Sequence, residues 1–115
     1  MYRVTKRDGS ITEFHIAKIG NAITRAFEAV GRQQHPSVIE LLALRVTAEF
    51  EPKIRNELIS VEDIQDCVER VLSEAGYSDV AKAYILYRKQ REKLRNVGST
   101  LLNYKELVNN YLRIN

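Results

Sequence analysis

Three basic residues near the start of the chain are spaced so that together they could bind phosphate. Lys6 and Arg7 are neighbours at the turn of a predicted hairpin, and Lys18 follows one turn into the next predicted helix. A triphosphate needs several converging cations, because each one neutralises only part of its charge and arginine can also bridge two oxygens. The helix start near His15 or Ile16 would add amide donors and the positive end of the helix dipole. The same residues also fit an exposed turn beside a solvated helix face.

A second basic group lies farther along the chain, on another predicted helix. Tyr84 precedes Arg88 by one turn and Arg91 follows three residues later, so the three side chains can project from one side of the helix. Such a group suits phosphate contacts beside an aromatic face that packs on a base. The alternative is a basic helix end that favours its own negative dipole, with Tyr84 and Tyr87 in the core. Convergence with the hairpin cations would decide between the two.

Other kinds of chemistry have little support in the sequence. The two histidines, His15 and His35, have no carboxylate or cysteine at metal-ligand spacing, and the single cysteine, Cys67, excludes an intramolecular disulfide and a thiolate zinc site. Glu62 and Asp63 crowd the start of a predicted helix, where acidic groups favour the dipole. The sequence has no glycine-rich loop that ends in Lys-Ser or Lys-Thr, and no dinucleotide-binding fingerprint. We therefore expect no metal site and no reaction catalysed by the chain itself.

The composition is that of one globular domain without a broad nucleic-acid surface. Of the 115 residues, 44% are hydrophobic and 29% are charged, which suits a single packed core. The 18 basic residues are offset by 15 acidic ones, so we expect no nucleic-acid partner. No apolar run is long enough to cross a membrane, the start does not resemble a secretory signal, and the lone cysteine fits a reducing compartment. These features predict a cytoplasmic protein without a membrane partner.

Local patterns predict the elements that must position the basic residues. Two short segments, 2–6 and 11–14, carry β-branched and aromatic residues on either side of Asp8-Gly9, which suits a tight hairpin turn. Apolar spacing then indicates four amphipathic helices. They begin at Ile16, at a cap on Ser37, at a capping box from Ser60 to Asp63, and at a cap on Ser78 or Asp79. The predicted fold is α+β, mainly α, with an N-terminal β-hairpin before four helices.

The domain boundary is predicted near Asn96, where a densely charged segment gives way to a polar stretch with a glycine. The domain would span 1–95, and 96–115 would be a linker and the start of a further segment. That segment carries another amphipathic stripe, made by Tyr104, Leu107, Val108, Tyr111 and Leu112, and has no stop signal. We therefore expect the chain to be part of a longer protein.

Taken together, these motifs resemble the ATP-cone family over about residues 2–95. The matching pieces keep their order and spacing: Val4-Thr5-Lys6-Arg7-Asp8-Gly9-Ser10, Phe14, Lys18-Ile19 with Ala22-Ile23, Ile64-Gln65-Asp66 with Val68-Glu69, and Ala81 to Arg88. Residues 102–108 are similar to the segment that joins a cone to the body of anaerobic ribonucleoside-triphosphate reductase. The resemblance makes the large subunit of that reductase the expected parent.

The resemblance implies a small β cap over a bundle of four helices, with ATP or dATP held between them as an allosteric effector. Cones of reductases permit activity with ATP and suppress it with dATP, usually through subunit association or the order of the active site. Mg²⁺ is implied only as the companion of the triphosphate. The implied partners are the catalytic body of the reductase and, in nucleotide-dependent contacts, further copies of the chain.

The resemblance also implies a set of nucleotide-binding residues. Within it, Val61 and Gln65 would lie near the adenine, and Arg88 and Arg91 would contact phosphates. Some members of the family bind two nucleotides, and Tyr84, Tyr87 and Arg88 would serve a second position. The full set is Val4, Lys6, Arg7, Thr12, Glu13, Phe14, His15, Ile16, Ala17, Lys18, Val61, Gln65, Tyr84, Tyr87, Arg88 and Arg91.

Three alternative functions stay open. The first is the cone of a nucleotide-sensing transcriptional repressor, although the zinc ribbon of such a repressor needs paired cysteines and Cys67 is alone. The second is a helical interaction module that binds no nucleotide, with its basic residues merely solvated. The third is catalysis by the chain itself, which is disfavoured because neither a radical-bearing glycine segment nor a cysteine pair is visible.

Overall fold

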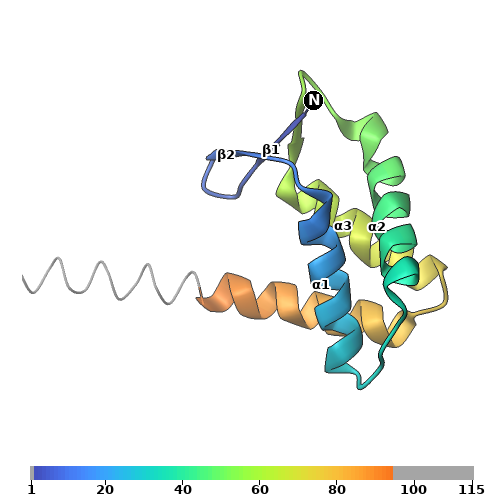
Figure 1. The fold of residues 1–115 in the computed structure, drawn as a ribbon. Helices are drawn as coiled ribbons and strands as arrows, with labels where there is room; N and C mark the ends of the chain where they lie inside the picture. Colours follow the sequence, from blue (N-terminus) through green and yellow to red (C-terminus); the bar gives the residue numbers. More distant parts are fainter. Residues whose placement is uncertain (1, 95–115) are drawn as a thin grey trace, which may run out of the picture. The chain divides into compact units, whose positions relative to one another are not determined.

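The computed structural model describes residues 2–94, which form a mainly helical α+β fold with a small sheet near the N-terminus (Figure 1). The chain divides into two compact units, Met1–Ile85 and Leu86–Asn115. The predicted boundary near Asn96 and the amphipathic stripe that follows it lie outside the described residues.

The predicted hairpin is confirmed. Its strands are β1, Arg3–Thr5, and β2, Ile11–Glu13, which pair antiparallel. Gly9 takes a φ of 87° in the turn, and Asp8 Oδ1 accepts hydrogen bonds from the Ser10 hydroxyl at 2.6 Å and the Ser10 amide at 2.9 Å. These bonds, the hydroxyl one first, hold the pKa of the Asp8 carboxyl below its ordinary value. Asp8 is therefore ionised at neutral pH, in the form that accepts both bonds.

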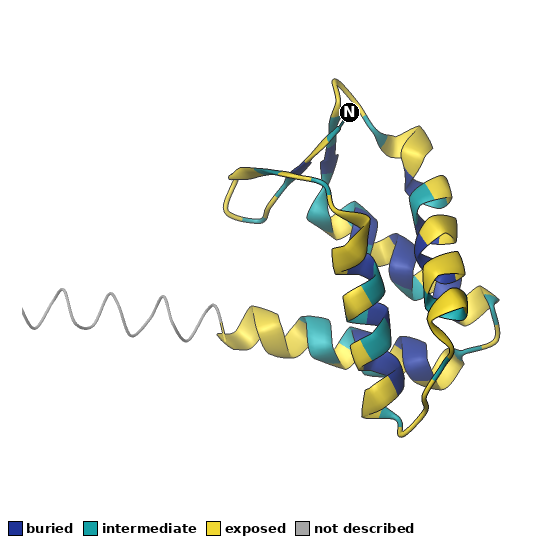
Figure 2. Cartoon of the chain, viewed as in Figure 1, coloured by how far each residue is buried: buried dark blue, intermediate teal, exposed yellow. Residues whose placement is uncertain are grey.

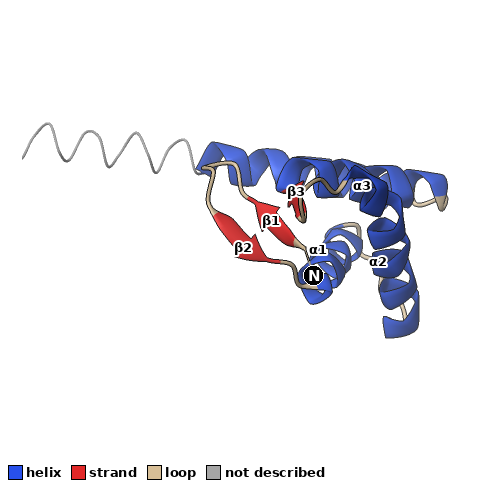
Figure 3. Ribbon diagram, turned by 90° about the horizontal axis from the view of Figure 1, so that it is seen from above, coloured by secondary structure: helices blue, strands red, loops and turns tan. Residues whose placement is uncertain are grey.

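A third strand, which the sequence did not predict, extends the hairpin on the other side of β1. This strand, β3, spans Leu58–Ser60 and pairs parallel with β1, so the strand order is β2-β1-β3 (Figure 3). Val4 and Ile59 lie opposite each other in this pair, and both are buried. Three residues are too few to show hydrophobic alternation, and a partner so distant in sequence leaves no local signal. The expected hairpin cap is therefore corrected to a three-stranded sheet.

The turn that leads into β3 holds two consecutive residues with positive φ, Asn56 at 53° and Glu57 at 63°. Across it, Arg55 and Leu58 exchange two amide-to-carbonyl hydrogen bonds of 2.9 Å. Both central residues of such a tight turn need positive φ, a conformation that asparagine tolerates and glycine adopts freely. Glu57 is the residue least suited to its backbone conformation in this turn.

We expect Glu57→Gly to raise the free energy of unfolding by about 0.5–1 kcal/mol, because glycine adopts positive φ without a steric penalty. Asn56→Gly is the matched control and should change stability less, since asparagine already tolerates this conformation. Urea denaturation followed by circular dichroism measures both variants. A Glu57→Gly variant less stable than the parent chain would show that the turn is not formed as described.

The described residues contain four α-helices, as predicted. They are α1, Ile16–Ala29, then α2, Pro36–Phe50, which the short 3₁₀ turn η1, Glu51–Lys53, follows, then α3, Val61–Glu74, and a helix over 78–94. The predicted cap at Ser60 is confirmed, because its hydroxyl accepts a hydrogen bond of 3.1 Å from the Asp63 amide. This bond satisfies one of the amides that a helix start leaves unpaired.

Two predicted helix caps are wrong. At the start of α2 the cap is His35, whose Nδ1 accepts a hydrogen bond of 3.1 Å from the Ser37 amide, so Ser37 lies inside the first turn. Pro36 takes the first helical position, where its missing N–H costs no hydrogen bond. The last helix begins at residue 78, so Ser78 and Asp79 lie in its first turn rather than before it.

In the first unit, α2 packs against both α1 and α3, with the buried faces of the helices turned toward one another (Figure 2). Val80, Ala81 and Tyr84, from the first part of helix 78–94, belong to the same core. After Ile85 that helix passes into the second unit. A complete four-helix bundle therefore stays a prediction.

An aromatic cluster of Tyr2, Phe14 and Phe50 joins the sheet to α2. The ring centroids lie 4.9 Å apart for Tyr2 and Phe14, 5.8 Å for Tyr2 and Phe50, and 5.5 Å for Phe14 and Phe50. Burial, and after it the negative charge of Glu51, raises the pKa of the Tyr2 hydroxyl above its ordinary value. Since Tyr2 precedes β1 and Phe14 follows β2, the cluster holds both ends of the hairpin against the end of α2.

Candidate functional site

The start of α1 has features that suit an anion. Its N-cap, His15, makes no side-chain capping bond, and its first turn contains no acidic residue. Ile16, Ala17 and Lys18 in that turn are exposed. The first amides of a helix have no partner within the helix, and its dipole places positive charge there. This helix start therefore presents amide donors and one cation, Lys18, to solvent.

The start of α3 has the opposite character. Ser60 already caps it, and Glu62 and Asp63 place two acidic side chains in its first turn. These groups satisfy an amide and offset the positive end of the dipole. An anion at this end would meet negative charge. The start of α1 is therefore better suited to phosphate than the start of α3.

The hairpin turn presents its two cations differently. Lys6 is exposed, whereas the Arg7 side chain is only 19% exposed and turns toward α3. Arg7 Nη2 donates a hydrogen bond of 3.3 Å to Gln65 Oε1, and Arg7 Nε lies 3.6 Å from Glu62 Oε1. The structure therefore brings together two residues of the predicted site, Arg7 and Gln65, that are 58 positions apart in the chain.

The strand missed by the sequence explains this contact. β3 runs parallel to β1 with Ser60 opposite Thr5, and α3 begins at the next residue, Val61. The first turns of α3 therefore lie beside the end of β1, where the hairpin turn begins. Glu62 is the residue of this site that the sequence analysis missed, because its position suggested only a dipole role. Arg7 and Glu62 are too far apart in the sequence for a local pattern to indicate their contact.

Several predicted site residues lie where their side chains serve the fold. Val4 and Tyr84 are core residues, 7% and 5% exposed, and Phe14 is part of the aromatic cluster. For Tyr84 this is the alternative core position that the sequence left open. Thr12 and Val61 are half-buried. The side chains of Val4 and Tyr84 thus offer little surface to a ligand.

Glu13 and His15 flank the start of α1 on its β2 side. Both are exposed, and His15 Nε2 lies 3.9 Å from Glu13 Oε2. Such exposed pairs hold their geometry weakly, so either side chain is free to turn toward a bound group. This places both residues within the same surface region as Ile16, Ala17 and Lys18.

The remaining predicted residues, Tyr87, Arg88 and Arg91, belong to the second unit. There, Arg91 Nη1 donates a hydrogen bond of 3.0 Å to Tyr87 Oη, and its guanidinium carbon lies 5.8 Å from the centre of the Tyr87 ring. Arg91 is exposed and Arg88 half-buried. Their convergence with the hairpin cations stays a prediction.

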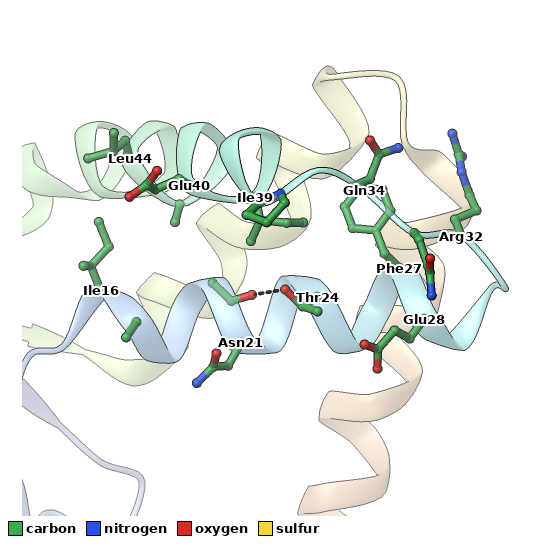
Figure 4. Close-up of a pocket in the computed structure, with 15 residues that line it drawn as sticks. Ile16, Asn21, Thr24, Phe27, Glu28, Arg32, Gln34, Ile39, Glu40 and Leu44 are labelled. Carbon is green, nitrogen blue, oxygen red and sulfur yellow. Dashed lines mark hydrogen bonds between the residues drawn. The ribbon is translucent and has the colours of Figure 1, made fainter.

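A cavity of about 700 Å³ opens between α1 and α2 (Figure 4). Of the predicted binding residues, Ile16 and Ala17 line it, and Lys6, Arg7, Lys18 and Gln65 do not. Its charged lining residues are Glu28, Glu40 and Arg32, and the Arg32 guanidinium is held by Asp79 at 3.1 Å. Two carboxylates against one paired arginine do not suit a triphosphate. We therefore place the candidate site at the hairpin turn and the α1 start, not in this cavity.

Residues 2–94 hold no group of three or more histidine, cysteine, aspartate or glutamate side chains that could bind a metal ion. Within the same described range, no helix combines the length and apolar character needed to cross a membrane.

Comparison with known proteins gives one family and several relatives. The family model described as "ATP cone domain" matches residues 2–93. A vitamin B12-dependent ribonucleoside-diphosphate reductase of Mycobacterium tuberculosis is 40% identical over 99 residues, which cover 86% of this chain and 14% of the reductase. The alpha subunit of a ribonucleoside-diphosphate reductase from Chlamydia pneumoniae is 39% identical over 98 residues, or 80% of this chain and 9% of that subunit.

An anaerobic ribonucleoside-triphosphate reductase of Haemophilus influenzae is 37% identical over 100 residues, which cover 87% of this chain and 14% of that protein. The chain thus spans between 9% and 14% of the length of these relatives.

Proposed function

The chain belongs to the ATP-cone family, and we propose that it binds ATP or dATP as an allosteric effector without catalysing a reaction. One observation carries the proposal: the uncapped, acid-free start of α1, with Lys18 exposed in its first turn. Helix starts of this kind bind phosphate through their amides and dipole. Of the helices α1, α2 and α3, α1 is the one that follows the hairpin with the basic turn.

In the proposed complex, the triphosphate lies against the α1 start, where Lys18 and the hairpin cations Lys6 and Arg7 contact it. The amides of Ile16 and Ala17 donate to its oxygens, and Mg²⁺ accompanies the triphosphate, bound by phosphate oxygens and water. The adenine lies toward α3, near Val61 and Gln65, because an amide side chain can pair with a base edge. For Arg88 and Arg91, phosphate contacts are proposed from the family resemblance alone.

The proposed parent is a ribonucleotide reductase, whose activity the domain controls through its catalytic body and through contacts between copies. ATP would permit activity and dATP would suppress it. The relatives carry the names of more than one kind of reductase. Assignment to the anaerobic kind depends on residues 102–108, which lie outside the described residues.

Isothermal titration with ATP and with dATP tests the proposal. We expect Lys6→Ala and Arg91→Ala each to weaken binding about tenfold, because losing one charge-assisted hydrogen bond costs about 1.5 kcal/mol. Lys53→Ala is the matched control, since Lys53 is an exposed lysine of η1. It should leave affinity unchanged.

Two outcomes would contradict the proposal in different ways. Unchanged affinity in both Lys6→Ala and Arg91→Ala would refute this pocket while leaving nucleotide binding elsewhere. No heat from either nucleotide with the parent chain would instead favour the helical interaction module. The repressor alternative would require DNA binding by the full-length protein.

A further inference from the structure

The guanidinium of Arg7 contacts two residues in the first turns of α3. It donates to Gln65 Oε1 at 3.3 Å, and its Nε, which is shielded from solvent, lies 3.6 Å from Glu62 Oε1. Arg7 and Gln65, which are both proposed to contact nucleotide, thus bind each other in this structure. A nucleotide that uses the Arg7 guanidinium must replace at least part of this arrangement.

The start of α3 does not depend on Glu62 for its cap or for its only acidic side chain. Ser60 caps the helix, and Asp63 supplies a second acidic group in the same turn. The Glu62 side chain is 58% exposed, so water can solvate its carboxylate without Arg7. Its position beside Arg7 nevertheless places one negative charge within contact distance of a cation in the proposed phosphate site.

We propose that Glu62 sets the affinity of the site by competing with the nucleotide phosphates for Arg7. This inference rests on the proposed function. A contact that a ligand must break lowers the affinity of that ligand by the free energy of the contact. An exposed ion pair contributes about 0.2–1 kcal/mol, so the competition weakens binding by up to about fivefold. Glu62 therefore tunes the effector concentration at which the site fills.

Glu62→Gln tests this directly, because glutamine keeps the size and the acceptor oxygen but removes the charge. We expect the affinity for ATP, measured by isothermal titration, to rise about two- to fivefold. Asp63→Asn is the matched control, with the same change of charge one residue along the same turn. It should raise the affinity less than Glu62→Gln does.

A double-mutant cycle separates competition for Arg7 from a general loss of negative charge. Competition predicts that Glu62→Gln has no effect on ATP affinity when Arg7→Gln is also present. A gain that persists in the Arg7→Gln background would overturn the inference, as would a fall in affinity on Glu62→Gln alone. The fall would show that Glu62 supports the bound state instead.

ATP and dATP together provide a second readout. They differ only at the ribose, so competition for phosphate predicts the same gain for both. Unequal gains would show that Glu62 contacts the ribose and would overturn the inference. Failure of the proposed function is distinguishable, because the parent chain would then bind neither nucleotide. Binding by the parent chain with no change in Glu62→Gln would overturn only the role of Glu62.

Discussion

Phe50→Ala should lower the free energy of unfolding by about 3–5 kcal/mol, which is a large part of the 5–15 kcal/mol typical of a domain. Phe50 is fully buried at the end of α2. Its ring meets those of Tyr2 and Phe14 edge to face, with centroids 5.8 and 5.5 Å away. Truncation leaves a cavity and removes both aromatic contacts.

The same change should also weaken the proposed nucleotide binding, because the aromatic cluster fixes the hairpin that carries Lys6. Phe27→Ala is the matched control. Phe27 is 1% exposed and packs edge to face on Tyr77, with centroids 5.0 Å apart, in a different aromatic contact from the hairpin cluster. We expect Phe27→Ala to lose a comparable amount of stability. The folded fraction of this variant should bind nucleotide with nearly the affinity of the unsubstituted chain.

Urea denaturation measures the stability of both variants, and titration under conditions where each is folded measures affinity. If Phe50→Ala does not fold, Phe50→Leu keeps most of the volume, and its affinity can be compared with that of Phe27→Leu. A loss below about 1 kcal/mol for Phe50→Ala would mean that Phe50 is not packed as described. Equal losses of affinity in the two alanine variants would mean that the hairpin has no special role.

The elements with local signals could be predicted from the sequence. Asp8-Gly9 marks the turn, because few residue pairs accept its backbone angles, and the apolar spacing from Ile16 marks α1. Ser60 and Asp63 mark the start of α3 through a capping pattern that needs only neighbouring residues. Each of these signals is carried by residues within a single element or turn.

The features that the sequence missed depend on distant partners or on unusual choices. β3 is three residues long and gains its stability from β1, far away in the chain. His35 is not among the residues that usually cap a helix, so its role at α2 was hidden. Arg7 and Gln65 are 58 positions apart, so only family resemblance could place them at one site. No pattern in the sequence indicated the contact between Arg7 and Glu62.

The start of α1 gives up stability that a simple change could restore. His15 makes no capping bond and no acidic residue lies in the first turn, so the helix dipole there is not offset. Lys18 occupies the third helical position, where glutamate is the favoured residue because it can reach back to the amide of the cap. A cation at this position is unfavourable for the helix and favourable for a bound phosphate.

Lys18→Glu should therefore change stability and binding in opposite directions. We expect the free energy of unfolding to rise by about 0.3–1 kcal/mol, because the new acid favours the dipole. We expect ATP affinity to fall roughly 30- to 100-fold, or about 2–3 kcal/mol, because a phosphate contact is lost and a repulsive charge is added. Urea denaturation and isothermal titration measure the two effects on the same preparation.

Lys82→Glu provides the matched control, since it makes the same change in net charge on another helix. Lys82 is an exposed lysine of the helix over 78–94 and is not one of the proposed binding residues. This control should leave ATP affinity within about twofold, because solvent screens an exposed charge that does not contact the nucleotide. A structural role for Lys18 predicts that stability and affinity fall together, whereas a phosphate-binding role predicts opposite signs. Retained affinity in Lys18→Glu would exclude the α1 start as the phosphate site, because no anion could bind there unaffected by a carboxylate in the first turn.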